Sequence, residues 1–77
     1  MLTPPLKNAF AITTSDTVNF ANDILAFYVG GVGNVTIFTV GGHTVLLTAV
    51  VVGTVYYIRC RRINATGTTA TALVGLW

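Results

Sequence analysis

The stretch from Val45 to Arg62, VLLTAVVVGTVYYIRCRR, constrains the fold more than any other part of this chain. It suits either a membrane helix with a basic flank or the strands of a sheet. The uncharged run from Val45 to Ile58 has 14 residues, which as a helix would rise about 21 Å at 1.5 Å per residue. The hydrocarbon core of a bilayer is about 30 Å thick. The run alone is therefore too short, and a single span would have to cover residues 40–58.

Residue types in the same stretch favour strands. Valine, isoleucine and threonine dominate it, and β-branched side chains are stiff at χ1 and fit a pleated sheet. From Tyr56 to Arg61 the side chains alternate between an apolar face and a face of tyrosine and arginine, which is the period of a half-buried strand. The alternation slips at Arg62 and Ile63, so a β-bulge or a strand end is expected there.

The rest of the chain has the pattern of an all-β protein, with short apolar runs separated by turns rich in glycine, asparagine and threonine. We predict strands near residues 8–13, 24–29, 34–40, 44–51, 54–63 and 69–76. The predicted fold is a small single-domain antiparallel β-sandwich or barrel, jelly-roll-like and oligomeric. The domain covers residues 8–77. Residues 1–7 form an extended N-terminal arm, because Pro4 and Pro5 remove backbone donors.

Low charge predicts that the domain is covered by other subunits or partners. Of the 77 residues, 53% are hydrophobic and 8% are charged, against roughly 25% charged in an ordinary soluble domain. A domain of this size buries only about 60% of its unfolded surface. Several predicted strands are apolar on both faces, and such strands need cover on both sides. We expect a second copy or a partner surface to supply that cover.

Residues suited to catalysis or metal binding are scarce, so we predict neither an enzyme nor a cofactor. Cys60 is the single cysteine and His43 the single histidine, which excludes an intrachain disulfide and a four-ligand structural zinc site. A serine protease-like arrangement would need His43 to meet Ser15 and either Asp16 or Asp23, which lie far from His43 in the sequence. The glycines at 30, 31 and 33 match the spacing of neither the Walker phosphate loop nor the dinucleotide-binding fingerprint. We expect them to provide positive φ in a hairpin connection.

The basic segment and the C-terminus supply the candidate partner-interface residues. The net charge of +2 is small for nucleic-acid binding, since affinity there follows the number of phosphates neutralised. Pairing with carboxylates across a subunit interface suits arginine better, and tryptophan is enriched at interface hot spots. The predicted interface residues are Tyr57, Arg59, Arg61, Arg62, Leu76, Trp77, Pro4 and Pro5.

Several segments in this order resemble a known family. They are AFAITTSDT near the start, AFYVGG and GNVTI in the middle, and IRCRRINATGTTATALVGLW at the end. Together they resemble the small head spike base proteins of tailed phages and phage-like gene transfer agents. The resemblance covers residues 9–77 and is densest from Ile58 onward.

The resemblance implies a non-enzymatic virion protein on the outer capsid surface, made in the cytoplasm of a bacterial host. Its partners would be further copies of itself, the major capsid protein and a spike or fibre, with no nucleic acid and no membrane. A pentamer at the vertices is favoured, and a trimer is the alternative. A competing hypothesis is a short single-pass membrane protein with a span near 40–58 and a basic cytoplasmic flank.

Overall fold

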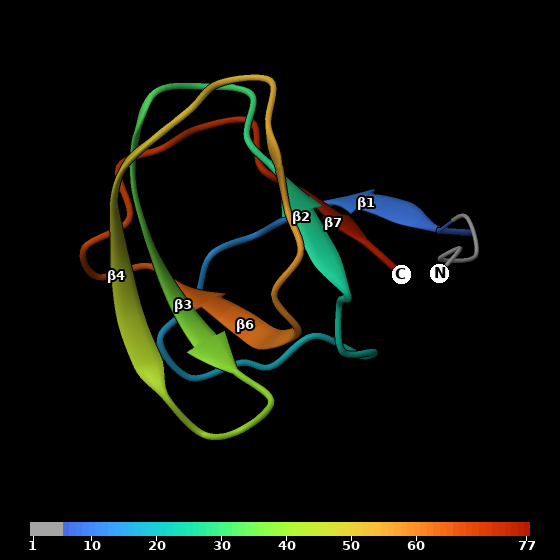
Figure 1. Cartoon of the computed structure of the whole chain (residues 1–77). Helices are drawn as coiled ribbons and strands as arrows, with labels where there is room; N and C mark the ends of the chain where they lie inside the picture. Colours follow the sequence, from blue (N-terminus) through green and yellow to red (C-terminus); the bar gives the residue numbers. More distant parts are fainter. Residues whose placement is uncertain (1–5) are drawn as a thin grey trace.

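The computed structural model describes residues 6–77, all of whose regular elements are strands (Figure 1). Pro4 and Pro5 lie outside the described residues, so the division into arm and domain stays a prediction. The strands are β1 (Ala9–Ala11), β2 (Ala26–Tyr28), β3 (Gly33–Thr39), β4 (Thr44–Val50), β5 (Val55–Tyr56), β6 (Cys60–Asn64) and β7 (Val74–Leu76).

These strands form two antiparallel sheets, which confirms the predicted fold class. One sheet has the order β1-β7-β2-β5 and the other β4-β3-β6. Side chains from both sheets meet in a common core, and both faces of the β3 backbone are largely closed to solvent. The core residues are Ile24, Phe27, Val29, Val35, Ile37, Val50, Cys60, Ile63, Ala70 and Leu73.

Residues 13–22 complete a jelly-roll arrangement without forming a regular strand. They run beside β6, where the Ser15 N–H donates to the Ile63 carbonyl at 2.9 Å and the Phe20 N–H donates to the Arg61 carbonyl at 2.8 Å. If this segment is counted with the seven strands, the order of the second sheet is 13–22, β6, β3, β4. Apart from the β3–β4 hairpin, which stays within the second sheet, successive members then alternate between the sheets as in a double-sheet jelly roll.

The predicted strand 54–63 is wrong as a single element, because it divides between the two sheets. β5 pairs with β2 in the first sheet, whereas β6 pairs with β3 in the second. Cys60 lies at the corner, since it also pairs with Ile24. The sequence predicts a bulge or strand end at Arg62 and Ile63, and the structure has a bulge one position before Arg62. Phe38 pairs with Arg62, whereas the next residue, Thr39, pairs with Cys60. Arg61 is therefore the extra residue of a bulge.

The predicted strand 69–76 is likewise too long, because only Val74–Leu76 is a strand. Residues 69 and 70 instead donate backbone hydrogen bonds to the Asn34 carbonyl, at 2.9 and 3.1 Å. The preceding turn covers the outer face of β3, where the Thr36 N–H donates to the Thr68 hydroxyl at 2.9 Å and Thr36 is buried. The chain thus covers part of its own two-sided apolar strand without a partner.

The glycine-rich connection before β3 differs from its prediction. Of its three glycines only Gly33 has a positive φ, of 146°. Gly30 and Gly31 are required by space, because an added Cβ would approach Ala72 to 2.7 Å and collide with the Thr71 hydroxyl. Close passage of residues 69–72 is therefore the main reason for glycine here.

The membrane-span alternative does not fit the observed elements. Residues 40–58 contain β4 and β5, and within residues 6–77 no helix has the length and apolar character needed to cross a bilayer.

Candidate partner-binding surfaces

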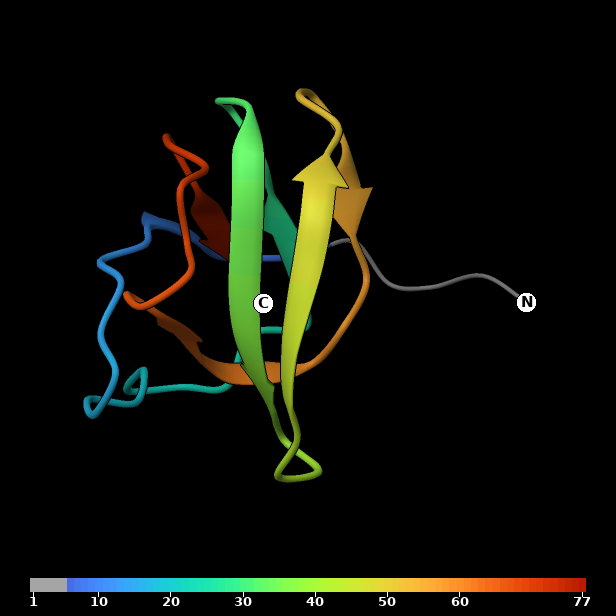
Figure 2. The same ribbon diagram turned by 90° about the vertical axis from the view of Figure 1, so that its left-hand side faces the viewer.

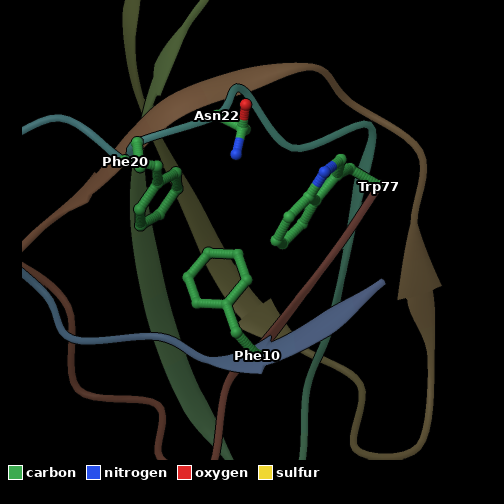
Figure 3. Close-up of a pocket in the computed structure, with 5 residues that line it drawn as sticks. Phe10, Phe20, Asn22 and Trp77 are labelled. Atoms are coloured by element: carbon green, nitrogen blue, oxygen red, sulfur yellow. The ribbon is translucent and has the colours of Figure 1, made fainter. Parts of the chain in front are cut away.

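Three aromatic side chains from distant segments surround an apolar hollow (Figure 3). The rings of Phe10 and Phe20 lie 5.3 Å apart at 77°, and those of Phe10 and Trp77 lie 5.3 Å apart at 71°. Both are edge-to-face pairs, which add to the packing energy of the rings. The hollow has a volume of about 200 Å³, and Ala21 and Asn22 complete its lining. None of the five lining side chains carries a charge.

Backbone contacts hold these aromatic residues in place. The Phe10 ring lies over Gly75 of the central strand β7, where an added Cβ would come within 2.6 Å of the ring. The Trp77 N–H donates to the Asn8 carbonyl at 3.0 Å, and the Trp77 carbonyl accepts from Lys7 and Asn8 at 2.8 Å. Phe20 is positioned by its own backbone bond to β6. The hollow is thus built on β1, the residue that follows β7, and the 13–22 segment.

A wider depression continues from the hollow along residues 13–21, with a volume of about 470 Å³. It exists because the chain turns away from a strand path here: the Ser15 hydroxyl accepts from the backbone N–H groups of Thr17 and Val18, at 3.2 and 3.0 Å. Val18 in this segment is 67% exposed. The β1 side of the sandwich therefore presents a continuous, mainly apolar recess.

The three predicted interface arginines lie in different environments. Arg59 and Arg61 are exposed. Arg62 is half-buried: its Nε donates to Asn64 Oδ1 at 2.8 Å, its guanidinium donates to Asn19 Oδ1 at 3.0 Å, and its Cζ lies 4.3 Å from the centroid of the Phe38 ring. The Arg62 side chain therefore makes contacts within the chain, and the exposed cations of this segment are Arg59 and Arg61.

The other predicted interface residues within the described chain also differ in their exposure to solvent. Tyr57 is 71% exposed in the crossing between the sheets. Leu76 is half-buried within β7, where it pairs with Ala9 and Ala26. Trp77 is half-buried and contributes its ring to the hollow. Whether any of them touches a partner remains a prediction.

The opposite side of the molecule exposes the apolar edge strand β4. This strand pairs only with β3 among the described strands. Val45 and Leu46 are 41% and 52% exposed, and Val51, just beyond the strand, is 61% exposed. Val45 pairs with the buried Ile37, so it points toward the core side and still lies open to solvent. The two-residue strand β5 is too short to cover it.

Two titratable side chains, those of Cys60 and Asp16, make hydrogen bonds within the described residues. Burial raises the pKa of the Cys60 thiol to about 12, so it stays protonated, and it donates to the Ile58 carbonyl at 3.3 Å. His43 is exposed in the turn between β3 and β4. Asp16 accepts hydrogen bonds from the Thr66 N–H and hydroxyl, at 2.9 and 2.6 Å. Residues 6–77 contain no cluster of three His, Cys, Asp or Glu that could hold a metal ion.

Comparison with known proteins places this arrangement in context. No protein-family model and no curated protein matches the sequence. A solved structure described as "Capsid of native GTA particle computed with C5 symmetry", where GTA denotes a gene transfer agent, contains a matching chain. The two structures superpose with a TM-score of 0.85 and 34% sequence identity, over 95% of this chain and 84% of that chain.

This chain belongs to the family of that gene transfer agent capsid chain. The family is one of phage-like capsid-associated proteins, which agrees in this coarser sense with the resemblance found in the sequence.

In this capsid-family chain, sequence reasoning missed Phe10 and Phe20. They are ten positions apart and lie in segments of ordinary composition, so no local spacing connects them with Trp77. The AFAITTSDT stretch contains Phe10 and was noticed only for its resemblance. The β4 edge had a clearer signal, because the run from Val45 to Ile58 contains no charged residue.

Proposed function

We propose that this chain is a structural virion protein on the outer surface of a phage or phage-like capsid, acting as a head spike base or decoration protein. In this proposal it binds the major capsid protein as a symmetric oligomer, with a pentamer at the vertices favoured over a trimer. It has no enzymatic activity and is made in the cytoplasm of a bacterial host. A spike or fibre is a further candidate partner.

The observation that carries the proposal is the 34% identity and TM-score of 0.85 to a chain of a capsid computed with C5 symmetry. The match spans 95% of this chain, so it does not rest on a short shared segment. A small subunit repeated around a symmetry axis gains avidity from several weak contacts with a symmetric lattice. It also stabilises the shell when it binds only the assembled state.

Exposed arginines suit the capsid-facing part of this role. Arg59 and Arg61 extend from the segment that crosses between the sheets and from the bulge that follows. Exposed guanidinium groups pair with carboxylates on a partner in bidentate geometry. Such pairs on an interface rim weaken as salt increases, because mobile ions screen them over about 10 Å at 0.1 M ionic strength.

The proposal is tested by adding the purified chain to heads assembled without it and imaging both samples. We expect extra density on the outside of the shell, at the fivefold vertices for the favoured pentamer. Density at threefold positions would support the trimer instead. Heads that show no extra density and do not retain the protein on sedimentation would contradict the proposal.

Arginine variants test the capsid contact in the same sedimentation assay. We expect Arg59→Ala and Arg61→Ala to weaken head binding, and the weakening to be largest at low salt. Arg62→Ala is the informative comparison, because its side chain is engaged within the chain. Its main effect should be a loss of about 1–2 kcal/mol of unfolding free energy, from two partly exposed hydrogen bonds and a cation–π contact. Unchanged head binding for both Arg59→Ala and Arg61→Ala would remove the arginines from the proposed interface.

A further inference from the structure

If the chain forms the symmetric ring of the proposed function, each copy needs two different contact surfaces. Neighbours in a closed ring of more than two subunits meet head to tail, so a patch on one copy faces another patch on the next. The fold offers two such patches, at opposite edges of the sandwich. One is the apolar β4 edge and the other is the aromatic hollow of Phe10, Phe20 and Trp77.

Charge is distributed unequally between these regions of the chain. From Ile24 to Ile58 the sequence contains no aspartate, glutamate, lysine or arginine, and this range includes the whole of β4. Natural proteins commonly protect an exposed edge strand with lysine, proline or a covering element. β4 has no charged side chain, and its exposed side chains include Val45 and Leu46. Such an edge is suited to permanent cover by another protein surface.

The hollow at the other edge suits a side chain from a protein better than a free ligand. It is open to solvent and continues into the depression along residues 13–21, whereas a small-molecule pocket encloses roughly 70–90% of its ligand's surface. Its lining is aromatic, and its single polar side chain is Asn22. Aromatic residues around a recess are typical of sites where a partner's apolar side chain is anchored.

Register places β4 and residues 13–22, which contribute Phe20 and Ala21 to the hollow, in the same rows of one sheet. Val45 pairs with Ile37, Ile37 pairs with Ile63, and the Ser15 N–H bonds to the Ile63 carbonyl. Residues 13–22 and β4 therefore lie at opposite ends of these rows, as Figure 2 shows for the two sides of the sandwich. A second copy placed sideways, without a shift along the strands, brings its β4 edge beside the recess of the first.

We propose that the β4 edge of one copy packs against the Phe10–Phe20–Trp77 hollow of a second copy, with apolar side chains of the edge covering the aromatic recess. This head-to-tail contact repeats around the ring. A typical stable interface buries about 800 Å² on each partner. Two such interfaces would occupy about a third of the 4656 Å² surface of one copy, which a domain with so few charges can provide.

Variants at each edge test the contact on the purified full chain. Leu46→Lys places a charge on β4, and Ala21→Lys places one at the mouth of the hollow; both positions are exposed. Ala65→Lys, in an exposed turn that lines neither the hollow nor the depression and lies outside β4, is the matched control. We expect light scattering to give a multiple of 8.1 kDa for the wild type and Ala65→Lys. Leu46→Lys and Ala21→Lys should each remain at 8.1 kDa.

Mixing the two monomeric variants then identifies head-to-tail geometry. Leu46→Lys keeps an intact hollow and Ala21→Lys keeps an intact β4 edge, so one pair of compatible surfaces remains. We expect the mixture to form a dimer of one copy each and nothing larger. If Ala21→Lys alone stays oligomeric while Leu46→Lys is monomeric, the contact is edge to edge and the proposal is wrong.

Further outcomes also decide the question. Circular dichroism checks that each variant keeps its strands, and Val51→Lys replaces Leu46→Lys if the latter is unfolded. A wild type that stays at 8.1 kDa, or variants that both remain oligomeric, would overturn the head-to-tail contact. Either result leaves the proposed capsid role open, because imaging of heads tests that role separately.

Discussion

At the scale of single residues, polar side chains join segments that are far apart in the sequence. Asp16 and Thr66 are 50 positions apart, and their two hydrogen bonds connect the 13–22 segment with the turn after β6. The Thr66 hydroxyl and N–H hold the pKa of the Asp16 carboxyl below its ordinary value of 3.8, with a smaller contribution from Arg62. The charged carboxylate is therefore the form that stabilises this connection.

The Asp16 contact predicts a dependence of stability on pH. Because its pKa is lowered in the folded state, its stabilising contribution is complete above the unfolded pKa and is lost as the pH falls through the folded pKa. We expect the wild-type melting temperature to fall between pH 5 and pH 2 more than that of Asp16→Asn, when both are measured by circular dichroism at fixed protein concentration. Equal declines in the two proteins would contradict this role for Asp16.

At the scale of elements, the junction between β3 and the segment 69–72 depends on the absence of a side chain at Gly33. Its φ is 146°, and an added Cβ would lie 2.4 Å from the Ala70 backbone nitrogen. Nearby, the register of β3 with β4 shifts, Ala49 has a φ of 55°, and the Asn34 side chain accepts from the Ala49 N–H at 2.9 Å. The start of β3 is therefore an irregular site held by specific contacts.

Gly33→Ala is expected to destabilise the domain by about 2–4 kcal/mol, because it combines left-handed strain with a clash against backbone atoms that cannot move aside. Urea unfolding measures the change. Gly41→Ala is the matched control, since its Cβ would meet nothing closer than 3.6 Å, and it should change stability by less than about 0.5 kcal/mol. Similar losses for both variants would mean that local crowding at Gly33 is not the cause.

At the scale of the whole molecule, the proposed head-to-tail contact would make the stability of each copy depend on assembly. The partly buried side chains beside the core include Phe10 and Phe20 at one edge and Leu47 and Tyr56 at the other. A neighbour at each edge would bury these groups more fully. Association that favours the folded state raises its apparent stability with concentration.

We therefore expect the melting temperature of the wild type to rise with protein concentration. Ala21→Lys, which obstructs the hollow, should melt at a temperature independent of concentration, whereas Ala65→Lys should follow the wild type. Differential scanning calorimetry over a hundredfold range of concentration measures this dependence. A concentration-independent wild type would indicate that the isolated domain carries all of its own stability.

The sequence by itself determined the all-β class, because β-branched residues and apolar alternation are local properties that favour strands wherever they pack. The low charge of the chain also led to the prediction that a second copy or a partner covers it, which stays a prediction. Only the tertiary structure decided that residues 57–59 cross between sheets, since that depends on the pairing of Cys60 with both Ile24 and Thr39. The role of Arg62 was likewise hidden, because its partner Asn19 is 43 positions away. The hollow depends on three distant aromatic residues whose meeting no local pattern encodes, and it exists because the sandwich brings the end of β7 beside β1 and residues 13–22.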